Sequence, residues 1–181
     1  MMGAVVHAVH LSPTHSFSKT TQFSIRVLEG LGVEGDAHMG VTVKHRFHVK
    51  RDPTAPNLCQ VHLIPDELHD TLQAAGFPVT AGQLGENITT RGMTLADLPV
   101  GTRLAIGNDV VLELTAMRNP CVWIERFMPG LLAQVKTTDE NGKVIRKAGV
   151  MCIVLQGGEV HAGDPIAVTL PPLPPRAVKP I

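Results

Sequence analysis

The residues best suited to chemistry lie in the short run Arg118-Asn119-Pro120-Cys121. An apolar segment that predicts a buried strand precedes it, and a segment that predicts one or two turns of helix follows. Asn119 suits the N-cap position and Pro120 the first helical position, because a missing N–H costs no hydrogen bond there. Cys121 then lies in the first turn, among free backbone N–H groups and beside the charge of Arg118. These surroundings favour the reactive thiolate over the thiol.

Cys121 also has an alternative interpretation as a structural residue. It precedes Ile124 and Met128 at helical spacing, so it can share their apolar face. Free cysteines commonly behave as small buried apolar residues. The local sequence therefore leaves a reactive thiol and a core thiol equally open.

Two glycine-rich turns, residues 30–40 and 82–88, carry further polar side chains. Glycine lets the backbone turn tightly and approach other groups closely. The first turn holds an acid and an imidazole, and the second holds an acid and an amide. The residues concerned are Gly35, Asp36, His38, Gly85, Glu86 and Asn87. Taken alone, the first pair is also explained by an Asx-turn with an exposed imidazole, and the second pair by capping of backbone groups.

Residues 41–57 are polar, basic and interrupted by prolines, which predicts an exposed loop. Lys44 and Arg46 are cations of this loop, and His45 and His48 accompany them. A solvated charged surface explains such a run as well as a binding role does.

The composition excludes several classes of function. The 16 basic and 16 acidic residues cancel, which argues against a nucleic-acid binder with a broad basic surface. Aromatic residues make up 3% of the chain, too few for stacking single-stranded bases. No apolar run approaches the roughly 20 residues of a membrane span, and residues 1–12 do not resemble a signal peptide. Three cysteines without CxxC spacing indicate free thiols in a reducing compartment, so we expect a cytoplasmic protein that binds neither nucleic acid nor membrane.

Short apolar segments between glycine turns dominate the rest of the chain. The main predicted strands are residues 4–11, 23–28, 60–64, 100–107, 110–115, 150–155 and 166–170, and the predicted helices are 65–75, 93–98, 121–128 and 131–136. This pattern predicts a mostly β fold, a barrel or strongly bent sheet with a few short peripheral helices. Residues 1–170 are expected to form a single domain, and the proline-rich residues 171–181 an extended tail.

Two further expectations concern packing. Trp123, Phe127 and Leu131 recur at helical spacing, which predicts an apolar stripe in the core. Cys152 lies in an apolar strand and is expected to be a core residue.

Residues 137–147 are expected to form a polar turn.

A set of motifs, taken in order, resembles the MOSC domain, the C-terminal domain of molybdenum-cofactor sulfurases. The resemblance covers about residues 4–168 and is closest to the small stand-alone bacterial members. The motifs are Gly32-Val33-Glu34-Gly35-Asp36-Ala37-His38, Gly82-x-Leu84-Gly85-Glu86-Asn87-Ile88-Thr89, Arg118-Asn119-Pro120-Cys121, Gly149-Val150-Met151 and Gly158-x-Val160-x-x-Gly163-Asp164.

The resemblance implies a barrel-like MOSC fold with one functional cysteine, which maps onto Cys121. In the family this thiol is associated with sulfur handling or with ligation of molybdenum held by a pterin, the molybdenum cofactor (molybdopterin). Asp36 and His38 are then implied as proton-donating groups beside the metal ligand Cys121. The groups implied in cofactor binding are Arg118, Asn119, Lys44, Arg46, Glu86, Asn87, Gly35 and Gly85.

Several functions remain open on this basis. Some family members reduce N-hydroxylated compounds with electrons from partner proteins, so a molybdenum-dependent oxidoreductase acting on a small molecule is one hypothesis. A sulfur transferase, or a non-catalytic module that delivers sulfur or cofactor, is another. A cysteine-dependent hydrolase with His38 as base is a third. The chain shows no flavin, haem or iron–sulfur motif, so a reductase needs a separate electron-transfer protein. The sequence does not decide whether the chain is an enzyme or a homodimer.

One position departs from the family pattern. Related sequences carry an arginine just before the strand that begins Gln60-Val61, and this chain has Cys59 there. If that arginine binds the anionic cofactor, its loss weakens binding. Cys59 is otherwise either an inert strand cysteine or a redox partner of Cys121.

Overall fold

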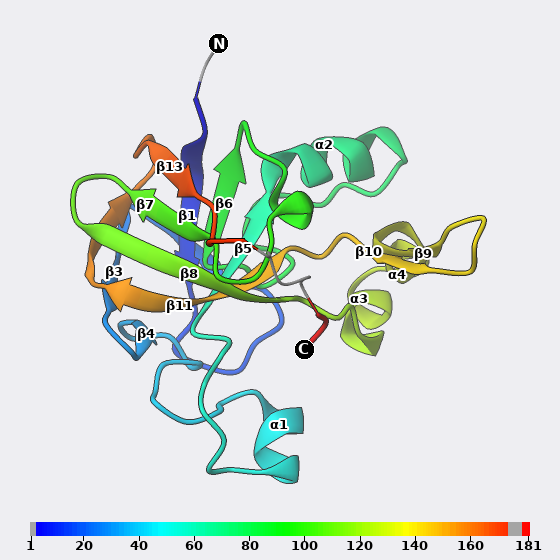
Figure 1. Cartoon of the computed structure of the whole chain (residues 1–181). Coiled ribbons are helices and arrows are strands. Elements are labelled where there is room, and N and C mark those ends of the chain that lie inside the picture. The colour runs from blue at the N-terminus through cyan, green and yellow to red at the C-terminus, as the bar shows by residue number, and fades with distance from the viewer. Residues whose placement is uncertain (1–2, 174–178) are drawn as a thin grey trace.

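The computed structural model describes residues 3–173 and 179–181. Its centre is an eight-stranded, strongly bent sheet (Figure 1). The strand order is β13 (Ile166–Thr169), β7 (Arg103–Ile106), β8 (Val110–Met117), β11 (Val150–Gln156), β5 (Val61–Pro65), β6 (Ile88–Arg91), β1 (Val5–Leu11) and β2 (Thr20–Gln22). Neighbouring strands are antiparallel except for β5 and β6, which are parallel.

The sheet is bent but not closed into a barrel. Only one isolated bridge, between Val5 and Pro165, joins β1 to the start of β13. Three backbone hydrogen bonds support this seam: from Val6 N to Asp164 O (2.9 Å), from Gly163 N to Val6 O (2.8 Å) and from Ile166 N to Ala4 O (2.8 Å). The prediction of a mostly β fold with a bent sheet is therefore confirmed, and the sheet takes the open form.

The remaining elements are short. A three-stranded sheet contains β12 (Gly158–His161), β3 (Ser24–Leu28) and β4 (Gly32–Val33), and a separate hairpin contains β9 (Lys136–Thr138) and β10 (Val144–Arg146). The helices are α1 (Arg46–Arg51), α2 (Asp66–Ala74), the single turn η1 (Leu95–Asp97), α3 (Val122–Phe127) and α4 (Leu131–Val135). Within the described residues, no helix has the length and apolar composition needed to cross a membrane.

The core follows the alternation read from the sequence. Along β8, the even-numbered residues from Val110 to Ala116 are buried, while the odd-numbered ones are only half-buried. Cys152 on the neighbouring β11 is fully buried, which confirms it as a core residue. A second apolar cluster, which includes Ile64, Leu72 and Ile124, packs α2, α3 and α4 against the end of the sheet.

The predicted apolar stripe is wrong at Trp123. Its side chain is 55% exposed, and the Arg126 guanidinium lies 4.6 Å above its ring centre. The reason is that α3 ends at Phe127 and a new helix begins after Gly130, so the three positions do not share one helical face. Leu131 is nevertheless fully buried.

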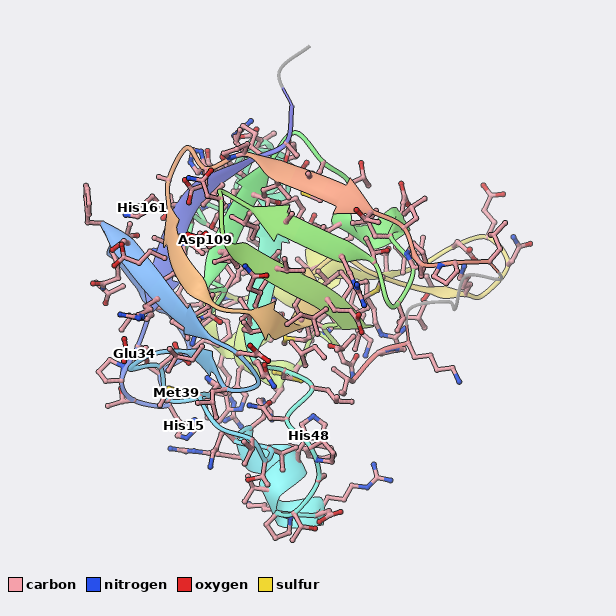
Figure 2. The ribbon with its side chains drawn as sticks, turned by 60° about the vertical axis from the view of Figure 1, so that its left-hand side comes forward. His15, Glu34, Met39, His48, Asp109 and His161 are labelled. Carbon is pink, nitrogen blue, oxygen red and sulfur yellow. The ribbon has the colours of Figure 1, made fainter. Side chains whose placement is uncertain are left out.

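The sequence patterns did not predict α1, the β9–β10 hairpin or the short strands β2, β4 and β12. Helix α1 interrupts the predicted loop 41–57 and buries no residue, and it projects from the rest of the molecule in both views (Figures 1 and 2). The hairpin occupies the predicted polar turn 137–147, and its side chains are mostly exposed. Hydrophobic periodicity cannot reveal elements that bury so little.

The end of the chain pairs with the end of β8. Met117 N donates to Lys179 O (2.9 Å), and Ile181 N donates to Met117 O (3.1 Å). This part of the predicted tail is therefore extended, while residues 174–178 lie outside the described residues.

The cysteine segment depends on close backbone packing at Gly149. Arg118 N donates to Gly149 O (2.9 Å), and Gly149 has a φ of +84°. A Cβ atom there would lie 2.0 Å from Leu63 O, a contact that no side chain tolerates. Backbone atoms of β5 form this barrier, so it cannot relax by a change of rotamer.

We expect Gly149→Ala to lower the free energy of unfolding by more than about 4 kcal/mol or to prevent folding. Gly142→Ala is the matched control, because Gly142 has a φ of +78° but open space around it, so only a backbone cost of about 1 kcal/mol applies. Urea unfolding measures both values. Equal losses would show that the contact with Leu63 does not matter.

Candidate functional site

Cys121 stands where β8 turns into α3. It is the N-cap of α3, with extended backbone (φ −123°, ψ 173°), and its carbonyl accepts a hydrogen bond from Ile124 N (3.0 Å). The predicted N-cap, Asn119, is wrong by two residues. The Asn119 Oδ1 atom is instead used to accept a hydrogen bond from Arg146 Nε (3.1 Å). In addition, the ring of Pro120 disfavours helical backbone at the residue before it. The thiol itself is partly exposed and forms no disulfide.

Arg118 joins the cysteine segment to the second glycine turn. Its Nη1 atom donates to Leu84 O (2.8 Å). Burial lowers the pKa of the Arg118 guanidinium, and the charges of Cys121 and Glu86 act in the opposite direction. Among the described residues no carboxylate lies within ion-pairing distance of Arg118, so its positive charge has no direct ion-pair partner there.

Asp36 is the centre of a buried hydrogen-bond network. Its Oδ2 atom accepts from Lys19 Nζ (2.5 Å), Ser12 N (3.1 Å) and Asn87 Nδ2 (3.2 Å). Its Oδ1 atom accepts from His38 N (2.9 Å) and lies 3.2 Å from His38 Nδ1. The Asp36 side chain is 2% exposed and that of Lys19 is 4% exposed. The network therefore brings the two predicted glycine turns into direct contact.

The surroundings in this network shift the pKa values of both Asp36 and Lys19. Burial alone would raise the pKa of Asp36, but hydrogen bonds from His38 and the charge and hydrogen bond of Lys19 outweigh it and hold the pKa below its usual range. Burial lowers the pKa of Lys19, and Asp36 opposes that shift. An ionised pair with several hydrogen bonds is the arrangement that makes buried charges tolerable.

Glu86 and Asn87 have structural contacts inside the molecule. Asn87 Oδ1 accepts from His62 N (3.1 Å) on β5, so the amide links β5 to Asp36. Glu86 is fully buried, and its Oε1 atom accepts from Gly82 N (2.6 Å) and from the Thr89 hydroxyl (3.1 Å). Glu86 is therefore an interior group rather than a surface group.

The two glycines of the site differ in their surroundings. Gly85 has a φ of +88°, and a Cβ atom there would lie 2.6 Å from Phe17 O. Gly35 has a φ of +79° with open space around it. At Gly85 both close packing and the backbone conformation therefore disfavour a side chain, whereas at Gly35 only the backbone conformation does.

The basic loop meets the site through histidine rings. The ring centres of His15 and His38 are 5.1 Å apart, those of His38 and His45 are 6.3 Å apart, and those of His45 and His48 are 5.5 Å apart. Loss of solvation, followed by the charges of His38 and His48, lowers the pKa of His45 to about 4. Figure 2 shows His15 and His48 on the side of the molecule from which α1 extends.

Lys44 and Arg46 flank His45 on this loop. Asn57 holds the start of the loop in place, because the Asn57 Nδ2 atom donates hydrogen bonds to His38 O and Gly40 O, both at 2.9 Å. No group of three or more His, Cys, Asp or Glu within the described part of the chain has a metal-binding arrangement.

Sequence reasoning missed Lys19 and His62. A lysine in a Ser/Thr-rich loop gives no local sign that it is buried, and only the presence of a buried acid elsewhere could have suggested it. Burial and the charge of Arg118 lower the pKa of His62 far below its usual value, and its Nε2 atom lies 2.8 Å from Ala148 O. His62 is therefore a neutral, buried ring that packs inside the molecule next to the site.

A cavity of about 300 Å³ lies on the other flank of the cysteine segment. Its lining includes Leu68, Leu95, Met117 and Arg146, and neither Cys121 nor Asp36 contributes. This cavity is therefore separate from the arrangement around the thiol.

Comparisons with known proteins agree with this arrangement. The MOSC domain model matches residues 42–167, and the chain belongs to the MOSC domain family. The relatives include YuaD of Bacillus subtilis, which is 27% identical over 180 residues, covering 92% of this chain and 91% of YuaD. The name of that protein associates it with metal–sulfur cluster biosynthesis.

Solved structures share the fold. The crystal structure of Bacillus subtilis YuaD aligns with a TM-score of 0.74 and 24% identity, covering 92% of this chain and 96% of YuaD. YiiM from Geobacillus stearothermophilus aligns with a TM-score of 0.63 and 18% identity over 97% of this chain and 80% of that one. YiiM from Escherichia coli gives 0.60 and 21%, over 94% and 71%. The expected MOSC fold is thus confirmed.

The Asp36–Lys19 pair leads to a stability prediction. Asp36→Asn leaves Lys19 as a buried, unpaired cation, so we expect a loss of about 3–5 kcal/mol in the free energy of unfolding. Because folding lowers the pKa of Asp36, its contribution is present above the unfolded value of about 3.9 and is lost as the pH falls below it. Chemical unfolding at several pH values measures the difference between wild type and variant.

The double variant Asp36→Asn/Lys19→Met is the control, because removing the unpaired cation should restore much of the lost stability. A difference between wild type and Asp36→Asn that does not shrink in acid would contradict an ionised Asp36.

The three thiols differ in predicted reactivity. Burial raises the pKa of Cys59 to about 11 and that of Cys152 higher still, so their thiolates are scarce at neutral pH. Cys121 is partly exposed and should react first with iodoacetamide. We expect one rapidly labelled site in the native protein, identified by peptide mass spectrometry, which Cys121→Ser removes and Cys59→Ser leaves intact. Rapid labelling of Cys59, which is also partly exposed, would contradict the raised pKa of its thiol.

Proposed function

We propose that this protein binds the molybdenum cofactor, with Cys121 as metal ligand, and acts as a small reductase of N-hydroxylated compounds. The observation that carries the proposal is the partly buried Arg118 cation, which has no direct ion-pair partner among the described residues, beside a free thiol. A positive charge held without a carboxylate partner favours an anionic ligand, and a soft thiolate favours a soft metal. Membership of the MOSC family supports this pairing.

The residues present fit such a cofactor. Molybdopterin carries a phosphate and dithiolene sulfurs, so it needs cations and one protein ligand rather than a ligand cluster. Arg118 and the basic loop residues Lys44 and Arg46 supply positive charge, and Cys121 supplies the thiolate. When bound, the cofactor supplies electron transfer to the substrate. Cys59 replaces the family arginine, so Arg118 carries more of the anion binding in this chain.

His38 is the residue best placed to exchange a proton with substrate. Its Nδ1 atom lies against Asp36 Oδ1, so the Nδ1 proton is held there and Nε2 is left to exchange. The His38 side chain is 25% exposed, whereas Asp36 is buried. Asp36 therefore orients the ring, as carboxylates do for other functional histidines.

A sulfur-carrier role is the second candidate, and the relative YuaD favours it. The name of YuaD refers to metal–sulfur cluster biosynthesis, and a partly exposed thiol beside Arg118 suits a persulfide as well as a metal. The hydrolase hypothesis gains no such support, because no hydrogen bond joins Cys121 to an imidazole in the described residues. The proposal also includes a separate electron-transfer protein, a homodimer and a cytoplasmic location.

Metal analysis tests the proposal. The full chain is expressed in a host that makes the cofactor, and molybdenum and pterin are measured per protein. We expect stoichiometric molybdenum and pterin in wild type, loss of molybdenum in Cys121→Ser, and loss of both in Arg118→Ala. Cys59→Ser is the control and should load normally.

Two outcomes would redirect the assignment. Persulfide on Cys121 without molybdenum supports the carrier role. Normal molybdenum loading in Cys121→Ser rules out this thiol as the metal ligand.

A further inference from the structure

A row of acidic and imidazole groups runs from the surface to the buried Glu86. His7 Nε2 lies 3.4 Å from Asp66 Oδ2, His69 Nδ1 lies 3.0 Å from Asp66 Oδ1, and His69 Nε2 lies 3.4 Å from Glu86 Oε1. The His7 side chain is 46% exposed, that of His69 is 2% exposed and that of Glu86 is fully buried. The row therefore connects solvent to the acid beneath the cysteine segment.

Both ring nitrogens of His69 face carboxylate oxygens. A neutral imidazole carries one N–H, so one lone pair would then point at a negatively charged oxygen. Burial excludes bulk water from this contact, and within the described residues His69 Nε2 and Glu86 Oε2 have no hydrogen-bond partner. Unpaired polar atoms in such a place are costly. One additional proton between His69 and Glu86 removes the conflict.

We propose that the Asp66–His69–Glu86 triad holds one exchangeable proton beneath the thiol site and relays protons between solvent at His7 and Glu86. The proton lies on His69 Nε2 or on Glu86, and in either position it fills the 3.4 Å contact. When Glu86 gives up a proton, the Nε2 proton of His69 replaces it. The ring then turns over, so that its unprotonated nitrogen faces Asp66 and takes up a proton that passes from solvent through His7 and Asp66. Only N–H and O–H bonds form and break in this relay.

The charged groups on the Asp66 side keep the proton away from that acid. Arg91 on β6 donates to Asp66 through Nε (3.1 Å) and Nη2, and it also pairs with Asp70. Burial would raise the pKa of Asp66, but hydrogen bonds from His69 and Arg91 hold it below its ordinary value. The extra proton therefore belongs on the Glu86 side of His69.

On the Glu86 side of His69, the neighbouring titratable groups are His10, Lys19 and Arg118. His10 on β1 lies between the hydroxyls of Thr21 and Thr89, both at 3.0 Å, and burial lowers its pKa. The positive charges of Lys19 and Arg118 interact with Glu86. His10 is thus a neutral neighbour, and the two cations link Glu86 electrostatically to the thiol site.

The relay gives the proposed reductase a source of protons. Reduction of a hydroxylamine to an amine takes up two electrons and two protons and releases water, and the electron-transfer partner supplies only the electrons. This use of the triad rests on the proposed function. The presence of the proton does not, because it follows from the contacts of His69.

Nitrogen NMR of the histidine side chains in the full chain tests for the proton. His161 is the internal control, because Glu159 (3.7 Å) and Asp164 (3.9 Å) flank its ring at the surface, where it is 39% exposed (Figure 2). At about pH 8 we expect the triad to retain its proton as a second N–H on His69 or as a protonated carboxyl detected by infrared spectroscopy, and the His161 signal gives the comparison with a histidine outside the triad. Glu86→Gln should abolish either signal, because the amide donates to His69 without an added proton.

A neutral His69 without a protonated carboxyl in wild type would overturn the proposal. His69→Gln provides a second measurement if Glu86→Gln does not fold, since it should remove the infrared signal as well. In cofactor-loaded protein, His69→Gln should slow turnover at least about tenfold with unchanged molybdenum content, and His161→Gln should not. Unchanged turnover in His69→Gln overturns the relay. Absence of any wild-type turnover contradicts only the reductase, because the spectroscopic result still decides the triad.

Discussion

The buried carboxylate of Asp36 is the constraint on which the thiol site depends. A charge without solvent costs several kcal/mol unless donors surround it, and Asp36 is reached by donors of Ser12, Lys19, His38 and Asn87. These donors come from the polar loop after β1, the first glycine turn and the second glycine turn. Because one carboxylate must satisfy all of them at once, the loops cannot shift independently. Irregular backbone thereby gains the fixed geometry that a binding site requires.

Charge pairing then explains what the site can hold. Asp36 neutralises Lys19, Arg91 pairs with Asp66, and Arg118 is left with only a backbone carbonyl as a hydrogen-bonded partner among the described residues. The positive charge of Arg118 lies beside the partly exposed Cys121, whereas burial raises the pKa of the other two thiols, Cys59 and Cys152. An anion with a soft metal or a sulfur atom satisfies both features, whereas a neutral substrate satisfies neither.

Much of the fold could be predicted from the sequence, because burial leaves a periodic signal. Alternation along β8 located the strand that ends at the cysteine segment, and Gly85 marked a turn that admits no side chain. The hydrogen bond between Asp36 and Asn87 joins positions 51 residues apart, and no local pattern encodes such a pairing. The error at Asn119 has the same cause, since its partner Arg146 lies on a hairpin that the sequence did not predict.

The contacts of His69 bear on the choice between reductase and carrier. Transfer of a sulfur atom from one thiol to another needs proton exchange only at the surface, where solvent supplies it. Reduction of an N–O bond consumes protons, and the row from His7 to Glu86 is the proposed store of one of them. A buried carboxylate–imidazole–carboxylate arrangement costs stability, and a carrier has no use that offsets this cost. The proposed proton store is therefore an argument for the proposed reductase, whereas the name of the relative YuaD points towards sulfur handling.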